Sequence, residues 1–182
     1  MRKLAFSRPT SIILGATLLL SIIVLQRSSP CDHSQPITSI GACYQAAYAA
    51  RAYYDAIVAE DYTQAFRYVA TFSTYPELPL QIPYKIQEEH WVNRMRNAKA
   101  DGVYIAEVRG IEVWTDDAYP MGRASVVIVA DGKEHVVAQD IHFMKRERWQ
   151  IDSVQSEGDF GRLDEALGGH LTQFCMYPEN CE

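Results

Sequence analysis

The spacing of apolar residues changes once along this chain, at Asp101-Gly102, and this change constrains the fold more than any other feature. Before it, from Ser39 to about Ala100, apolar side chains recur with a helical period. After it they alternate, as they do on strands with one buried face. We therefore expect an α+β domain in which N-terminal helices pack on a strongly curved, cone-like antiparallel sheet.

Three helices are expected in the first half of the domain. The first follows a capping residue, Thr38 or Ser39, and the second spans Tyr62 to Ala70 after a turn at Glu60-Asp61. A proline-containing loop separates the second from the third, which spans Tyr84 to Lys99. Tyrosines at helical spacing on the first helix are expected in the core. They are Tyr44, Tyr48 and Tyr54.

Strands are expected throughout the second half. The first region is either one bent strand or two strands interrupted at Gly110. The predicted strand regions are 103–115, 123–130, 133–144 and 149–154. Asp131-Gly132 predicts a two-residue type I′ hairpin, because both central positions of that turn need a positive φ. This turn places Arg123 opposite Asp140 on the neighbouring strand.

A second turn, at Arg146-Glu147, would fix the register of the last hairpin. It would place His142 opposite Ile151, Asp140 opposite Ser153 and Met144 opposite Trp149. Four polar residues would then share one face of the sheet with a set of valines. They are Arg123, Asp140, His142 and Ser153.

The N-terminal segment has the pattern of a membrane-targeting element. Basic residues precede an apolar stretch from Ser11 to Leu25, Arg27 follows it, and the region contains no carboxylate. We expect an uncleaved signal anchor, with the N-terminus in the cytoplasm and the rest of the chain in the periplasm or outside the cell. Secretion after signal cleavage is the alternative. The predicted segments are a cytoplasmic stub and anchor (1–27), a tether (28–38), the domain (39–157) and a cysteine-bracketed tail (158–182). A short helix from Leu163 to Phe174 is expected in the tail.

Cysteine usage agrees with an oxidising compartment. All four cysteines follow the apolar stretch, and disulfides are the expected state there. Three connectivities are open, of which the local pairs Cys31 with Cys43 and Cys175 with Cys181 are the simplest. A metal site is not expected, because no Cys-x-x-Cys occurs and no histidine lies at ligand spacing from a cysteine.

The charge of the exported part argues against a nucleic-acid partner. Four of the 17 basic residues flank the apolar stretch, so 13 basic residues accompany 23 acidic ones in the remainder. Nucleic-acid binding needs a basic face. No phosphate loop, dinucleotide fingerprint, nucleophile elbow or zinc-protease motif is present, and no cofactor is expected.

Two segments carry a resemblance to a known superfamily. Residues 53–66 are similar to a helix, a small acidic turn and an aromatic-bearing second helix. Residues 141–154 resemble a closing hairpin in which a tryptophan precedes an aliphatic residue by two positions. The chain from Ser39 to Val154 thus resembles the nuclear-transport-factor-2-like (cystatin-like cone) superfamily. That resemblance implies a helical hairpin capping a bent sheet.

Enzymes of this superfamily place an acidic residue or a histidine inside the cone. Under that interpretation Asp140 would be the general base and His142 its acid or orienting partner, near Arg123. The alternative is a structural Arg123–Asp140 pair beside a solvated histidine. His90 and Trp91 would lie near the cone mouth, as tentative ligand-binding residues together with Asp140 and His142.

Two function classes follow. The first, which we favour, is a non-enzymatic, membrane-anchored binding or assembly domain that acts through its sheet face or cone pocket. Its partners would be the membrane, through residues 11–25, and a second copy or another protein, through Val127, Val129 and their neighbours Val126 and Ile128. The second class is a small-molecule isomerase, dehydratase or hydrolase that uses Asp140 and His142.

Overall fold

The computed structural model describes Cys31 and residues 37–71, 83–116, 119–158, 160, 163, 167 and 169–170. The predicted anchor, most of the tether, and Cys175 and Cys181 lie outside these residues. No helix in the described part of the chain is long and apolar enough to cross a bilayer.

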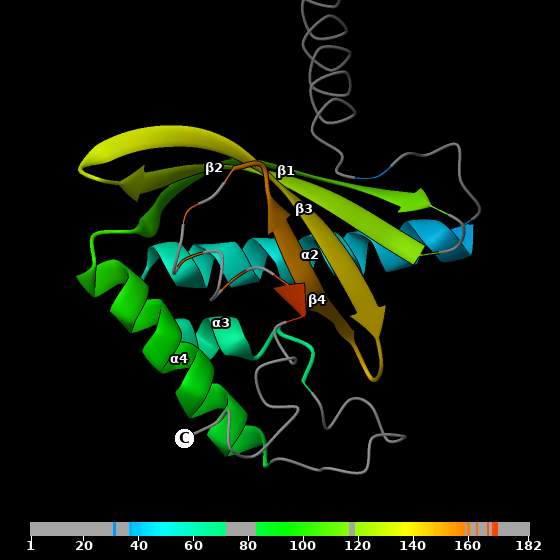
Figure 1. The fold of residues 1–182 in the computed structure, drawn as a ribbon. Helices are drawn as coiled ribbons and strands as arrows, with labels where there is room; N and C mark the ends of the chain where they lie inside the picture. Colours follow the sequence, from blue (N-terminus) through cyan, green and yellow to red (C-terminus); the bar gives the residue numbers. More distant parts are fainter. Residues whose placement is uncertain are drawn as a thin grey trace, which may run out of the picture.

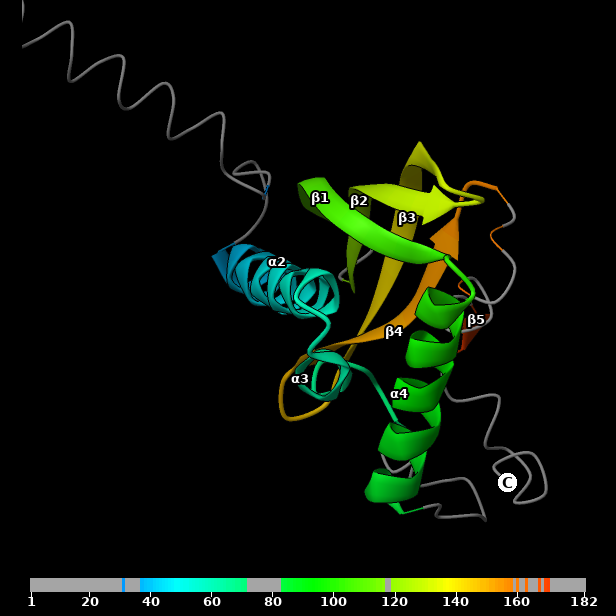
Figure 2. The same ribbon diagram turned by 90° about the vertical axis from the view of Figure 1, so that its left-hand side faces the viewer.

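The described residues form helices followed by one antiparallel sheet, which confirms the predicted α+β class (Figure 1). The helices are α2 (Ile37–Val58), α3 (Tyr62–Phe66) and α4 (Tyr84–Ala100). The strands are β1 (Tyr104–Asp116), β2 (Tyr119–Ala130), β3 (Lys133–Lys145), β4 (Trp149–Ser156) and β5 (Gly169–His170), adjacent in that order. All three helices lie on one side of the curved sheet (Figure 2). We call that side of the sheet the inner face and the opposite side the outer face.

Helix α2 is the main contact between the helices and the sheet. It is rich in alanine, the strongest helix former, and its small side chains allow close approach to the strands. Tyr53 and Tyr54 are fully buried. Tyr44 and Tyr48 are 41% and 69% exposed, so the prediction that they belong to the core is wrong. They lie four residues apart, so they share one face of the helix.

Helix α3 begins as predicted and ends early. The carboxylate of Asp61 caps it by accepting a hydrogen bond from the Gln64 amide at 3.0 Å. The helix stops at Phe66 instead of Ala70, because Val69 forms an isolated parallel bridge with Ile151 of β4. Two backbone hydrogen bonds of 2.7 Å to Ile151 replace the helical ones.

The β1–β2–β3 meander follows the predicted turn chemistry. Asp131 and Gly132 have φ values of 52° and 70°, so a two-residue turn sets the register and Arg123 lies opposite Asp140. Strand β1 is continuous through Gly110, and two register shifts against β2 accompany the bend of the sheet.

The predicted β3–β4 register is wrong. The connection uses residues 146–148 instead of two residues, which pairs Lys145 with Trp149. A bulge at Asp152 then shifts the pairing again, so His142 lies opposite Ser153 and Asp140 opposite Gln155. The total shift of two residues preserves the faces, because side chains alternate with a period of two. The four predicted polar residues therefore still share one face.

The C-terminal part differs from the predicted helix over Leu163 to Phe174. Leu163 and Leu167 are helical and fully buried in the core. Gly169 and His170 instead form β5, which pairs with Val154 and Ser153 of β4. Consecutive glycines at 168–169 disfavour a helix at this point.

A polar network crosses the buried space between α2 and the sheet. The Tyr54 hydroxyl donates to Gln139 Oε1 at 2.9 Å, and Gln139 Nε2 donates to Ser156 Oγ at 2.9 Å. Gln139 is fully buried, so these bonds satisfy its amide. The neighbouring Tyr53 hydroxyl is buried without a hydrogen-bond partner among the described residues. Tyr53, Tyr54 and Gln139 therefore occupy part of the space in which the family resemblance implies a pocket.

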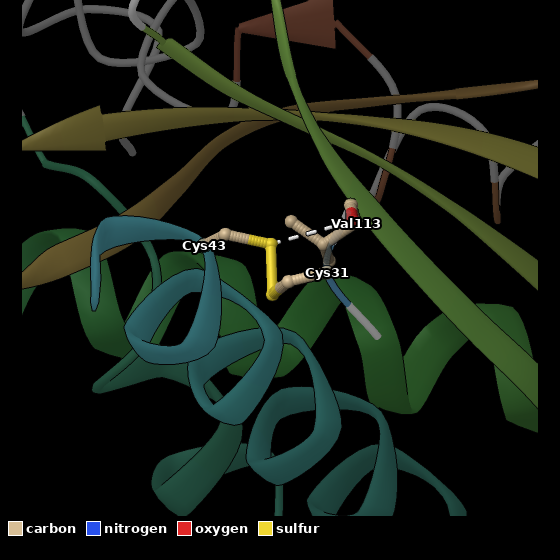
Figure 3. Close-up of a disulfide and its surroundings, with 3 residues drawn as sticks. All are labelled: Cys31, Cys43 and Val113. Carbon is tan, nitrogen blue, oxygen red and sulfur yellow. Dashed lines mark hydrogen bonds between the residues drawn. A yellow bond between two sulfur atoms is a disulfide. The ribbon is translucent and has the colours of Figure 1, made fainter. Parts of the chain in front are cut away.

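A disulfide joins Cys31 to Cys43 of α2, and their Cα atoms are 5.9 Å apart (Figure 3). Both cysteines are buried. Cys43 Sγ lies 3.3 Å from the carbonyl oxygen of Val113 in β1. This sulfur is oxidised and has no hydrogen to donate, so the approach is a packing contact. The disulfide therefore holds the start of the described chain against both α2 and β1.

Candidate functional site

The predicted polar set lies on the outer face of the sheet. Arg123 Nε and Nη2 donate to the two carboxylate oxygens of Asp140 at 2.7 and 3.1 Å. The two side chains remain 50% and 39% exposed. His142 and Ser153 follow on the same face in the next cross-strand row.

The electrostatics of Asp140 favour a permanently ionised carboxylate. The Arg123 hydrogen bonds, together with the Arg123 charge and a smaller contribution from His142, hold the pKa of Asp140 below its ordinary value. A general base works best with a pKa near the working pH, which usually requires a raised carboxyl pKa. This geometry is that of an exposed cross-strand ion pair.

His90 and Trp91 lie on the other side of the sheet from Asp140. Trp91 is buried in the core, with its ring centroid 5.6 Å from that of Phe66 and 6.2 Å from that of Tyr53. Burial, and then the charge of Arg94, lower the pKa of His90. The predicted ligand-binding residues therefore form two separate groups.

The valines predicted as a docking face are largely covered. Val126 and Ile128 are fully buried on the inner face, and Val127 is buried on the outer face. Val136, opposite Val127, is the exposed member of this region.

A groove between α2 and the β3–β4 connection is the strongest candidate site. It has a volume of about 510 Å³ and is lined by aromatic rings and polar side chains. The lining residues are Tyr44, Gln45, Tyr48, Ala49, Tyr68, Glu147, Arg148 and Trp149. We call it the α2–hairpin groove. Its volume lies within the range of small-ligand sites.

Backbone pairing fixes the position of Tyr68 in this groove. Ile151 N donates to the Tyr68 carbonyl oxygen at 2.7 Å, and Gln150 Nε2 donates to the Val69 carbonyl oxygen at 3.0 Å. The Tyr68 ring meets Tyr48 edge-on, with centroids 6.5 Å apart and planes at 72°. Helix α2, the segment at Tyr68 and the β3–β4 hairpin, which are distant in sequence, thus form one surface.

Two cations lie over these rings. The Arg148 guanidinium lies 5.9 Å from the Tyr68 ring centroid and donates from Nη2 to the Arg67 carbonyl oxygen at 2.7 Å. Lys145 Nζ lies 5.7 Å from the Trp149 ring centroid. Among the described residues, no carboxylate lies within ion-pair distance of Arg67, Lys145 or Arg148. Within the described part of the chain these three cations therefore have no ion-pair partner, although one carboxylate, that of Glu147, also lines the groove.

Two polar side chains of the groove lining differ in their exposure. Trp149 is 5% exposed, and its Nε1 is buried without a hydrogen-bond partner among the described residues. Burial and the neighbouring Tyr48 hydroxyl raise the pKa of Tyr68, so its hydroxyl stays protonated. The groove combines ring faces, hydroxyl groups, the Arg148 cation and the Glu147 carboxylate, and Lys145 lies over the Trp149 ring. With two cations to one carboxylate, this set suits an anionic ligand with an apolar body.

The residues described around the groove do not form a metal site. Within the described part of the chain, no group of three or more His, Cys, Asp or Glu side chains is placed to hold an ion.

Sequence reasoning missed this site for a specific reason. Tyr44 and Tyr48 match a helical core pattern, and four consecutive charged residues, Lys145 to Arg148, are typical of a solvated hairpin tip. The Val69–Ile151 bridge that carries Tyr68 to the hairpin spans more than 80 positions and has no local signal. No local signal distinguishes Tyr44 and Tyr48 from core residues, because their spacing is the same.

Comparisons of the chain with protein-family models, with curated proteins and with solved structures find no match.

Proposed function

We propose that this chain is a membrane-anchored, extracytoplasmic binding domain, without catalytic activity, that holds an acidic segment of a partner protein in the α2–hairpin groove. The observation that carries the proposal is a groove lined by Arg148 and four aromatic rings, with Lys145 over the ring of Trp149. Among the described residues neither cation has an ion-pair partner. A recess with a nearly buried Trp149 suits a protruding chain better than a flat lipid surface. The N-terminal apolar stretch supports the location.

The order of helices followed by a curled sheet supports a relation to the nuclear-transport-factor-2-like superfamily. The geometry of Asp140 supports a binding role over the alternative enzymatic one, because its charge is already neutralised by Arg123. The buried Tyr54–Gln139–Ser156 network between α2 and the sheet supports the groove over the cone as the ligand site.

The test uses the full chain in detergent micelles and a rhodamine-labelled peptide of alternating glutamate and leucine. Fluorescence anisotropy should show binding that weakens with added salt, because screening shortens the range of the charge interaction. Replacing the glutamates of the peptide by lysines should abolish binding. Equal binding of the acidic and basic peptides would contradict the proposal.

Matched variants locate the site. Arg148→Gln should weaken binding by about tenfold, the loss of roughly one charge-assisted hydrogen bond. Lys133→Gln makes the same change of net charge at the β2–β3 turn and should leave binding unchanged. Tyr48→Ser should weaken binding, whereas Tyr119→Ser, which truncates another exposed tyrosine, should not. If the groove variant and its control weakened binding equally in either pair, the ligand would bind outside the groove.

A further inference from the structure

One end of the domain carries exposed aromatic side chains beside the disulfide. Trp114 of β1 is 38% exposed and Tyr119 of β2 is 65% exposed. Trp114 pairs with Met121, and Tyr119 lies two residues before Met121, so all three side chains lie on the outer face. We call Trp114, Tyr119 and Met121 the aromatic end. Figure 1 shows the end of β1 beside the start of α2.

The disulfide fixes where the chain from the predicted anchor reaches the domain. Cys31 is bonded to Cys43, and Cys43 Sγ lies 3.3 Å from the carbonyl oxygen of Val113, the residue before Trp114 (Figure 3). The attachment point therefore lies next to the aromatic end.

The length of the connecting chain then limits how the domain can turn. The apolar stretch ends at Leu25, and the six residues from there to Cys31 reach at most about 20 Å. A domain of this size is roughly 35 Å across. Without the disulfide, the connection would extend to Ile37, where α2 begins, and its reach would double to about 40 Å. With the disulfide, the connecting segment is too short for the end of the domain opposite Cys31 to face the bilayer. Without the disulfide, the segment is long enough for that orientation.

We propose that the Cys31–Cys43 disulfide orients the domain so that the aromatic end rests in the headgroup region of the membrane. This inference rests on the membrane attachment included in the proposed function. Tryptophan and tyrosine are enriched at membrane interfaces, where one end of the ring is apolar and the other is wet. Glu112 lies on the same face as Trp114, and its carboxylate would be repelled by anionic headgroups. We therefore expect the aromatic end to contact a bilayer without the help of negatively charged lipids.

The experiment places the full chain in phosphatidylcholine vesicles that contain doxyl-labelled phosphatidylcholine and records tryptophan fluorescence. The chain has three tryptophans, and Trp91 and Trp149 are buried in the domain. Trp114 is therefore the fluorophore available to lipid. We expect the doxyl lipid to quench Trp114 and the membrane to protect it from aqueous acrylamide. Both responses should be lost in Trp114→Phe and should not change with added salt.

Two further measurements distinguish a failure of membrane attachment from a failure of the proposed orientation. Vesicle flotation tests attachment alone, so a chain that does not float contradicts both the proposed location and this inference. A chain that floats while Trp114 stays open to acrylamide and unaffected by doxyl lipid overturns the inference and leaves the attachment intact. The Cys31→Ala/Cys43→Ala double variant should float and show weaker lipid quenching, because its tether is longer. Unchanged quenching in a folded double variant would refute the orienting role of the disulfide.

Discussion

Tyr53 and Tyr54 offer a matched test of how the buried space is held together. The two tyrosines are adjacent and fully buried, with ring centroids 5.1 Å apart. The hydroxyl of Tyr54 donates to Gln139, whereas the hydroxyl of Tyr53 has no hydrogen-bond partner among the described residues. Replacing each tyrosine by phenylalanine removes one oxygen atom and keeps the ring.

The two substitutions should have different effects on stability. Tyr54→Phe leaves the Gln139 carbonyl oxygen buried without its partner, and we expect a loss of about 1–3 kcal/mol in the free energy of unfolding. Tyr53→Phe removes a hydroxyl that is desolvated without compensation, so we expect no loss or a gain in stability. In a chain of this length each kcal/mol corresponds to roughly 2–4 °C in melting temperature.

Urea unfolding of the full chain in a mild detergent, followed by circular dichroism, measures both changes. Equal destabilisation by the two substitutions, or a neutral Tyr54→Phe, would refute the assigned hydrogen bond. A reversal of the two effects would place the polar network on Tyr53.

Three further predictions concern packing, charge and the disulfide. An added Cβ at Gly122 would lie 3.0 Å from the Phe143 ring and 3.3 Å from the Glu112 carbonyl oxygen, so Gly122→Ala should lower stability by about 1–3 kcal/mol. Gly110→Ala, which meets nothing within 4 Å, is its control, and equal urea midpoints would contradict the packing. Arg123 lowers the pKa of Asp140, so the ion pair stabilises the fold above the ordinary carboxyl pKa of 3.8, and this contribution disappears as pH falls through the lowered value. A carboxyl NMR titration should show a midpoint below 3.8 that rises in Arg123→Gln, and an unshifted midpoint would exclude the pair. Cys31→Ala/Cys43→Ala should reduce stability by up to about 3 kcal/mol in thermal unfolding, because the bond closes a short loop. An unchanged melting temperature would show that the Cys31–Cys43 disulfide does not restrain the unfolded chain.

Local turn chemistry made much of the sheet predictable. Asp131-Gly132 fixed the β2–β3 register and hence the Arg123–Asp140 pair, because a two-residue turn permits one pairing. The β3–β4 register failed, since the length of the connection and the Asp152 bulge depend on tertiary packing.

The candidate site was less predictable than the fold. Tyr44 and Tyr48 have the spacing of core residues, and only the position of α2 against the sheet shows that they are exposed. The groove also needs Tyr68 beside the hairpin, which depends on pairing between Val69 and the distant Ile151. A periodic pattern identifies a face of a helix but not what that face contacts.

The most direct test of the central claim is an NMR titration of the full chain with the acidic glutamate–leucine peptide. The indole Nε1–H of Trp149, buried without a hydrogen-bond partner among the described residues, provides a reporter within the groove lining. Binding in the α2–hairpin groove should shift this signal together with the amides of Tyr48 and Arg148. Shifts centred on Asp140 and His142, with Trp149 unaffected, would place the ligand on the outer face and contradict the account.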